Sequence, residues 1–328
     1  MNKASCWLEQ AIEGFLSFQV SLGYQRNTYE SQLHSFMNYV LQVCPDTEFL
    51  SRDIIMNYLE QQVSDVHRKA STLRLLGRYL QAVGQDAYIL PEEMYRTPKA
   101  DTPYIFSDQE LSNLFREIDH LEPEKGWISS VAPVLFRLIY TCGLRPKEGR
   151  ELKRTWINFD TGEIQIEKSK GKKDRLVVMS DEMLSLCRTF DASRSDAGIR
   201  GDYFFAKPNG EPFAELLIHR TFVTCWKRSV GLPSNAPYPR NIRVYCLRHR
   251  FATAVIHRWL DEKKDLRNKL PYLQEYMGHN RLTDTVYYLH LLPENLVASA
   301  EETTASIGSM RSISLSVENS LSEILESE

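Results

Sequence analysis

The chain lacks several features that would place it in common protein classes. Its longest apolar runs are far too short to span a bilayer, and its first residues, MNKASCWLEQ, turn polar too early for a secretory signal peptide. The six cysteines lie far apart, and none forms a CxxC pair or a Cys/His pair with metal-ligand spacing. No acidic cluster of the kind that holds catalytic metal ions stands out. We therefore expect a cytoplasmic protein with free thiols, no membrane segment, no metal and no cofactor.

Net positive charge is also missing, since the formal charge is −3, and this at first argues against a nucleic-acid partner. The distribution of charge weakens that argument, because residues 299–328 hold six Glu and one Arg. The rest of the chain is slightly basic, and its cations gather in the clusters KRTW, KSKGKKDR, KRSVG, RNIR and RHR. A local patch matters more for phosphate binding than the total charge, although most such clusters are only solvated surface. Charge alone leaves DNA binding open.

The spacing of apolar residues predicts a mainly α fold with one small antiparallel β-sheet. Residues 1–97 fit four short helices without any β pattern, and the two prolines of TPKADTPYIF indicate a linker at 98–103. In the segment 104–298, helices flank the short runs WINFD, EIQIEK and RLVVMS, which predict a sheet with two hairpins. The Ser- and Glu-rich residues 299–328 are predicted to form a partly disordered tail.

Two cations in the second segment lie where they could serve a reaction. Arg145 follows a strongly apolar helix that ends at Gly143 and precedes Pro146, so rigid elements hold it. From this stretch alone, a structural salt bridge to Glu148 is the preferred interpretation. Lys170 lies at the predicted hairpin tip of KSKGKKDR, where a mobile cation can reach a phosphate, but Lys172 and Lys173 compete for that role.

Further polar groups occur near helix ends toward the C-terminus. Arg248 and His249 lie near the start of a predicted helix, whose dipole attracts anions. His279 directly follows Gly278, which ends a helix, and we expect the turn to expose it. The adjacent Tyr287 and Tyr288 point about 100° apart on a helix, so they cannot share one function.

The order of these groups resembles the tyrosine recombinase family, of the phage-integrase type. The motif GLRxxE is followed by a Lys in a β-hairpin, LRH at a helix start, GH, and a Tyr nine positions after that His. The resemblance runs from the N-terminal helices to about residue 298. It implies a four-helix, SAM-like core DNA-binding domain at 1–97 and an α+β catalytic domain at 104–298. Within the family, LPYLQEYMGHNRLTDTVYYLHLLPE looks most like integrases and transposases of mobile elements.

The resemblance implies DNA strand exchange by transesterification, independent of metal and ATP. It makes Tyr288, not Tyr287, the nucleophile that forms a 3′-phosphotyrosyl link. Arg145 and Arg248 would stabilise the charge on the phosphate oxygens.

The remaining roles follow from the same resemblance. Lys170 would protonate the leaving 5′-oxygen, His279 would hydrogen-bond the phosphate, and Glu148 would orient the catalytic groups.

The implied partners are double-stranded recombination sites, a homotetramer on DNA, and accessory DNA-bending or directionality proteins. Family members commonly dock a C-terminal segment on a neighbouring protomer. The tail is a candidate for such docking because it carries the apolar residues Val317, Leu321, Ile324 and Leu325. The other interpretation is a disordered acidic tail.

One position departs from the family pattern. Three residues before the second arginine the family usually has His, sometimes Lys, whereas this chain has Tyr245. A phenol with a reference pKa of about 10 can donate a hydrogen bond but is a poor base near neutrality. From its position in the motif, His279 is the first candidate to accept the proton of the nucleophile in place of that histidine, and His249 is the second.

Three other functions compete with recombination. A non-catalytic, site-specific DNA-binding protein would keep the fold without forming a covalent adduct. A type IB topoisomerase would relax DNA without site preference. A metal-dependent nuclease would lose its activity in EDTA.

Overall fold

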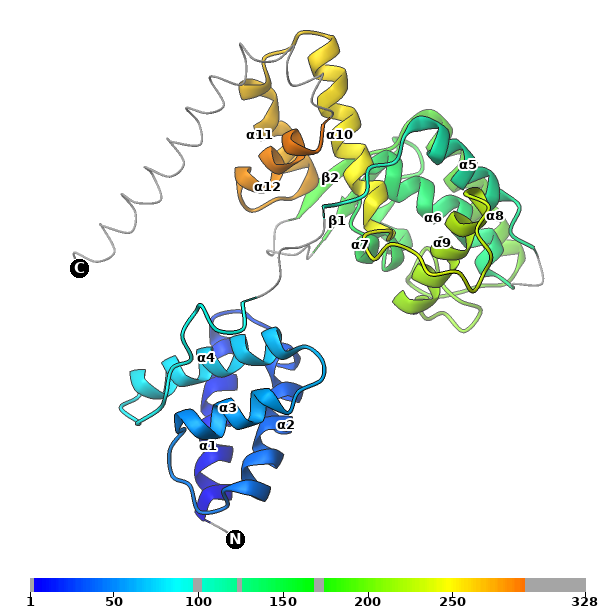
Figure 1. The fold of residues 1–328 in the computed structure, drawn as a ribbon. Helices are drawn as coiled ribbons and strands as arrows, with labels where there is room; N and C mark the ends of the chain where they lie inside the picture. The colour runs from blue at the N-terminus through cyan, green and yellow to red at the C-terminus, as the bar shows by residue number, and fades with distance from the viewer. Residues whose placement is uncertain (1–2, 97–101, 123–125, 168–173, 293–328) are drawn as a thin grey trace. The chain divides into compact units, whose positions relative to one another are not determined.

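The chain folds into two compact units, Met1–Ala100 and Asp101–Glu328. A computed structural model describes residues 3–96, 102–122, 126–167 and 174–292, and Figure 1 shows their elements. None of the helices in these ranges combines the length and the apolar run that a membrane crossing requires. Each unit has its own hydrophobic core and is described by itself.

The first unit is a bundle of four helices, as the apolar spacing predicts. They are α1 (Lys3–Ser21), α2 (Asn27–Val43), α3 (Arg52–Glu60) and α4 (Val66–Ala82). Each helix turns an apolar stripe inward, and Leu8, Phe15, Phe36, Tyr58 and Leu76 meet in one buried cluster. Aromatic edge contacts such as Phe36 against Tyr58, with ring centroids 5.0 Å apart, fix the packing of α2 on α3.

The second unit is also mainly helical. Its first helix begins at Ser107 with a capping box, in which Ser107 and Glu110 satisfy each other's backbone N–H groups. Its helices are α5 (Asp108–Asp119), α6 (Ile128–Cys142), α7 (Pro146–Arg150), α8 (Asp181–Asp196), α9 (Glu215–Ser229), α10 (Tyr245–Asp261), α11 (Leu266–Met277) and α12 (Leu282–Val286), with two 3₁₀ turns, η2 (Arg154–Trp156) and η3 (Tyr287–Leu291).

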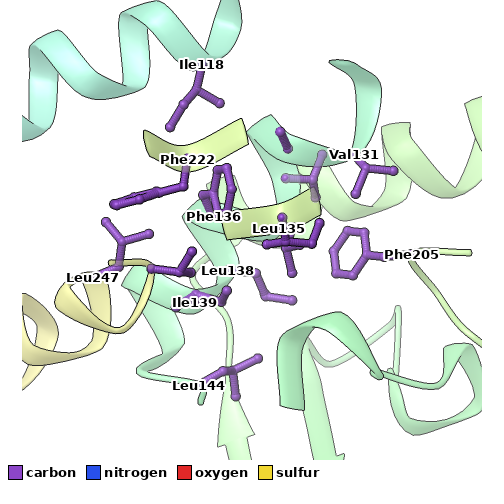
Figure 2. Packing of buried hydrophobic residues seen from close by; sticks show 14 of the residues in the cluster. Ile118, Val131, Leu135, Phe136, Leu138, Ile139, Leu144, Phe205, Phe222 and Leu247 are labelled. Carbon is purple, nitrogen blue, oxygen red and sulfur yellow. The ribbon is translucent and has the colours of Figure 1, made fainter. Parts of the chain in front are cut away.

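Helix α6 forms the centre of the main core of this unit. Its buried residues cover more than half of its circumference, so other elements must pack against it on several sides. Figure 2 shows Leu135, Phe136 and Ile139 of α6 among buried residues that include Phe222 of α9 and Leu247 of α10. A rigid α6 fixes the turn at its C-terminus, where Arg145 lies.

The predicted sheet is present but smaller than the sequence indicates. Strands β1 (Glu163–Ile166) and β2 (Arg175–Val178) pair antiparallel, with Ile166 opposite Arg175. The prediction of a third strand in WINFD is wrong, since only Ile157 makes an isolated bridge to Ile164. The next residue, Asn158, accepts hydrogen bonds from the backbone N–H groups of Asp160 and Thr161 and so turns the chain at once.

A second, smaller core in this unit joins the C-terminal elements. Residues of α10, α11 and η3, among them Ile256, Leu270, Leu273, Met277 and Tyr288, form one buried cluster. Helix α10 belongs to both cores, because its first turn packs with α6 and its later turns with α11 and η3. The first turn of α10 therefore lies between the two cores.

The cysteines of the described residues agree with the prediction of free thiols. Cys142, Cys187, Cys225 and Cys246 are buried and Cys44 is half-buried, and none is in a disulfide. Burial raises the pKa of the Cys142 thiol to about 11, so this group is inert at neutral pH.

Candidate functional site

Arg145 occupies the N-cap of α7, immediately after the tight turn that ends α6. Gly143 adopts a left-handed conformation with φ of 61°, and Pro146 starts the next helix. Glu148 accepts a hydrogen bond from the Arg145 backbone N–H (2.8 Å) and pairs with its guanidinium (2.7 Å). The salt bridge considered from sequence is therefore present, and it holds Arg145 in place.

Arg248 lies in the first turn of α10 and is fully buried. Its guanidinium donates to the carbonyl oxygen of Gly143 (2.6 Å) and to that of Met277 (2.7 Å), and it contacts His279 Nε2 (3.0 Å). Among the described residues its Nε has no hydrogen-bond partner. Burial lowers the pKa of Arg248, so this side chain is a cation that gains from an approaching anion.

The C-terminus of α11 collects three arginines from three different elements. The carbonyls of Tyr276, Met277 and Gly278 accept from Arg175 (2.9 Å), from Arg248 and from Arg145, respectively. The last carbonyls of a helix have no partner within the helix, and they form the negative end of its dipole. The turn after α11 therefore supplies the physical reason why these guanidiniums converge.

Arg175 is the residue that sequence reasoning missed. It begins β2, is buried, and forms a double hydrogen bond to Glu148 (2.9 and 2.7 Å). The alternation in RLVV could have predicted its burial. Val177 faces inward, and Arg175, two residues before it on the same strand, must face the same way. Glu148 thus bridges Arg145 and Arg175 and connects α7 with the hairpin.

His279 does not project from the turn, so the expectation of an exposed histidine is wrong. Gly278 ends α11 in a left-handed conformation as predicted, but the chain then turns inward and leaves His279 8% exposed. Its Nδ1 lies 2.8 Å from the Thr285 hydroxyl and its Nε2 faces Arg248. Burial, and then the charges of Arg248 and Arg145, lower the pKa of His279 to about 3, so it is neutral.

The two adjacent tyrosines lie in different surroundings. Tyr288 is 3% exposed, and its ring centroid lies 6.0 Å from that of His279 and 5.6 Å from that of His249. Tyr287 is 43% exposed. Burial raises the pKa of Tyr288 to about 12, against the charge of Arg248 and a hydrogen bond from it. Of the two tyrosines, Tyr288 is the one that packs beside His249 and His279 and whose ionised form is favoured by the charge of Arg248.

Tyr245 and His249 lie one turn apart at the start of α10. Their ring centroids are 4.8 Å apart, so His249 is placed between Tyr245 and Tyr288. His249 is buried, and its Nδ1 has no partner among the described residues. Burial, and then the charges of Arg243 and Arg248, lower the pKa of His249 to about 4.

Two sequence predictions cannot be followed into the site. Lys170, with its competitors Lys172 and Lys173, lies outside the described residues, between β1 and β2. The tail at 299–328 lies outside them as well. Within the described ranges, no group of three or more His, Cys, Asp and Glu side chains is placed to hold a metal ion.

The half-buried carboxylate of Glu148 leads to a prediction about stability. Burial alone would raise its pKa, but the hydrogen bonds and charges of Arg175 and Arg145 outweigh burial and hold it at about 2. The folded pKa is thus below the unfolded one, so this stabilisation is present above about pH 5 and is lost as the pH falls toward 2. Glu148→Gln should lower the free energy of unfolding at pH 7 by about 3 kcal/mol, because two buried guanidiniums lose their counter-charge.

Urea denaturation at pH 7 and at about pH 3 would check this prediction. The difference between wild type and Glu148→Gln should shrink at the lower pH, because the unfolded wild-type chain binds a proton at this carboxyl there while the folded protein does not. Glu215→Gln is the matched control, since Glu215 is exposed at the start of α9 and should change stability by less than about 0.5 kcal/mol. Equal effects of the two substitutions at pH 7 would contradict the role of Glu148.

Comparison with known proteins places this chain among the tyrosine recombinases. The model of the phage integrase family matches residues 106–295, more than half of the chain. The chain belongs to the phage integrase family and is a tyrosine-type site-specific DNA recombinase. Tyrosine recombinase XerD of Oceanobacillus iheyensis is 28% identical over 312 residues, which cover 88% of this chain and 96% of that protein.

Two solved structures share the fold. The Tn1549 transposon integrase in complex with transposon right end DNA has a TM-score of 0.63 at 14% identity, over 90% of this chain and 99% of its own. The post-cleavage complex of the XerH site-specific recombinase with palindromic difH substrate has a TM-score of 0.61 at 20% identity, over 84% of this chain and 78% of its own. They support the prediction of a mainly α chain with a small antiparallel sheet.

Proposed function

We propose that this recombinase cleaves and rejoins DNA through a 3′-phosphotyrosyl intermediate, without metal or ATP. Tyr288 attacks a backbone phosphorus, the bond from phosphorus to the 5′-oxygen breaks, and Lys170 protonates that oxygen. The 5′-hydroxyl of a second DNA end then reverses the step. Because the phosphodiester energy is kept in the covalent link, the cycle needs no external energy source.

The buried cations explain how the site could lower the barrier. The transition state carries extra negative charge on the phosphate oxygens, and two guanidiniums can each direct two N–H groups toward them. Arg248 has an unpartnered Nε and is desolvated, which strengthens its interaction with an anion. His279 would donate to the same phosphate once Arg248 engages it, and Glu148 would keep Arg145 in position.

The observation that carries this proposal is the surroundings of Tyr288. Its ring packs beside those of His249 and His279, and the charge of Arg248 favours its ionised form against burial. A purely structural tyrosine in an apolar core would gain nothing from these groups. The same contacts favour Tyr288 over Tyr287 as the nucleophile.

Binding to DNA would use both units. The helical unit at 1–97 would serve as the core DNA-binding domain, 104–298 as the catalytic domain, and 98–103 as the linker between them. Phosphate contacts would supply most of the affinity and a few helix residues the sequence preference. The two solved relatives are both bound to DNA, which supports duplex recombination sites as the substrate.

The biological setting follows from the same likeness. A role in integration, excision or transposition of a mobile element agrees with the fold shared with a transposon integrase. We expect a homotetramer on DNA in the cytoplasm, with accessory DNA-bending or directionality proteins and with the 299–328 tail as one candidate for protomer docking.

A test of this function is the capture of the covalent intermediate. Nicked duplexes from the DNA that flanks the gene should give an SDS-resistant protein–DNA adduct, because the short 5′ fragment diffuses away and blocks reversal. Peptide mapping of the adduct should place the nucleotide on Tyr288. The adduct should form equally in EDTA.

A non-catalytic DNA-binding protein is the alternative. It would bind the same duplexes in gel-shift assays and form no adduct on any of them. Relaxation of supercoiled DNA without site preference would instead indicate a type IB topoisomerase, and loss of cleavage in EDTA a nuclease.

A further inference from the structure

The cleavage step requires an acceptor for the proton of Tyr288. Burial raises the pKa of this phenol to about 12, so it does not ionise by itself at neutral pH. Tyr245 occupies the position at which the family usually carries a histidine, and a neutral phenol does not take up a second proton under these conditions. The acceptor must therefore be another group in contact with Tyr288.

His279 is in contact with Tyr288, but both of its ring nitrogens are engaged. Arg248 can only donate, so His279 Nε2 must accept in their 3.0 Å contact. The ring proton of the neutral imidazole is then on Nδ1, which donates to the Thr285 hydroxyl at 2.8 Å. In this tautomer His279 has no lone pair left for the Tyr288 proton. In the other tautomer, in which Nε2 donates to a bound phosphate, Nδ1 would accept from the Thr285 hydroxyl, so again no lone pair is left.

His249 is the other imidazole beside Tyr288, and its hydrogen-bonding capacity is unused. Its ring centroid is 5.6 Å from that of Tyr288, and of its two nitrogens it is the buried Nδ1 that has no partner among the described residues. A buried polar atom without a partner is costly and is rare unless a function or a ligand requires it. The charge of Arg248 favours the ionised form of Tyr288 and so assists the loss of its proton to an acceptor.

We propose that His249 is the general base for Tyr288 in this recombinase. It would take the role of the histidine that the family usually has at the position of Tyr245. This inference rests on the proposed function. In the cleavage step the Tyr288 proton passes to His249 as the bond from its oxygen to phosphorus forms. The bond from phosphorus to the 5′-oxygen breaks, and Lys170 protonates the leaving oxygen. In the rejoining step His249 returns the proton to Tyr288.

The charges around His249 explain how DNA would switch this base on. Arg243 and Arg248 face it and disfavour the imidazolium, whereas Tyr245 and Tyr288 contribute only neutral rings. A phosphate bound at Arg248 would offset that positive charge and raise the pKa of His249. The imidazole would thus become a better base only when the substrate is in place, and the enzyme would not ionise Tyr288 without DNA.

The experiment measures the single-turnover rate of adduct formation on a nicked duplex at saturating protein, between pH 5 and pH 9. His249→Ala should lower the rate at pH 7 at least 100-fold, with DNA binding within a few fold of wild type. The wild-type rate should be level above about pH 7, because the base is then neutral. The variant rate should keep rising by up to tenfold per pH unit, since it depends on direct ionisation of Tyr288. Added imidazole should restore part of the rate.

Two further variants separate this role from a structural one. His257→Ala, at an exposed histidine two turns along α10, should leave the rate and its pH profile unchanged. His249→Gln keeps most of the side-chain volume for the case in which His249→Ala unfolds, and it should show the same change in the shape of the profile. The proposal would be overturned if a His249 variant cleaved at the wild-type rate. It would also be overturned if the rate were lower at every pH, with the same pH dependence as wild type, and imidazole did not restore it. Failure of wild type to form any adduct would instead refute the proposed function.

Discussion

Tyr288→Phe should form no covalent adduct with nicked DNA, whereas Tyr287→Phe should form it at the wild-type rate. The substitution removes the oxygen that attacks phosphorus, and the hydroxyl of Tyr287 cannot replace it, because Tyr287 is turned toward solvent. The phenylalanine ring still fills the space among α10, α11 and η3, so the protein should fold. SDS gels of single-turnover reactions measure the adduct, and gel shifts should show that DNA binding stays within a few fold.

The two tyrosines serve as controls for each other. They are adjacent, lose the same atom, and differ in burial and in contact with Arg248. An adduct that persists in Tyr288→Phe and is absent in Tyr287→Phe would assign the nucleophile to the exposed residue. The site around Arg248 would then have to be described as a structural cluster.

Arg248→Lys should reduce the rate of cleavage by about 10²–10³-fold at saturating DNA. Lysine keeps the charge but cannot direct two N–H groups toward one phosphate, nor reach the oxygens of Gly143 and Met277 together. The loss should fall on the rate of the chemical step more than on DNA affinity, because the extra charge on phosphorus develops only in the transition state. Rapid-quench measurement of adduct formation checks the size of the effect.

Stability must be measured alongside, since Arg248 is fully buried. Arg258→Lys is the matched control, because Arg258 lies on the same helix and is exposed. It should change neither the urea midpoint nor the cleavage rate at saturating DNA. If Arg248→Lys is folded at the assay temperature and cleaves at the wild-type rate, Arg248 does not stabilise the transition state.

The local sequence was sufficient wherever a single turn or cap decides the structure. Gly143 and Gly278 end their helices and the hairpin pairs β1 with β2, as predicted, and Ser107 and Glu110 form a capping box from residues three apart in the sequence. These features depend on backbone conformation and on contacts a few residues apart. WINFD failed as a strand because Asn158 turns the chain after Ile157, and short-range β-propensity does not reveal that competition.

The long-range contacts of the site were beyond the reach of such reasoning. Arg175 was overlooked because its partner Glu148 is 27 residues away, and the burial of His279 depends on a hydrogen bond to Thr285 after the turn. The order of the motifs predicts which residue types the site needs. It does not predict which histidine nitrogens already take part in hydrogen bonds. That distinction is what moves the proposed general base from His279 to His249.

The sequence by itself determined the helical elements, the small hairpin, the family and the set of reactive residue types, because each is encoded in local periodicity, caps and motif spacing. The tertiary structure decided which of the two tyrosines is in contact with the cations, and how Arg145, Arg175 and Arg248 share the carbonyls at the end of α11. The physical reason is that burial, charge and hydrogen-bond occupancy belong to contacts between distant segments, and these exist only when the two cores around α10 have formed.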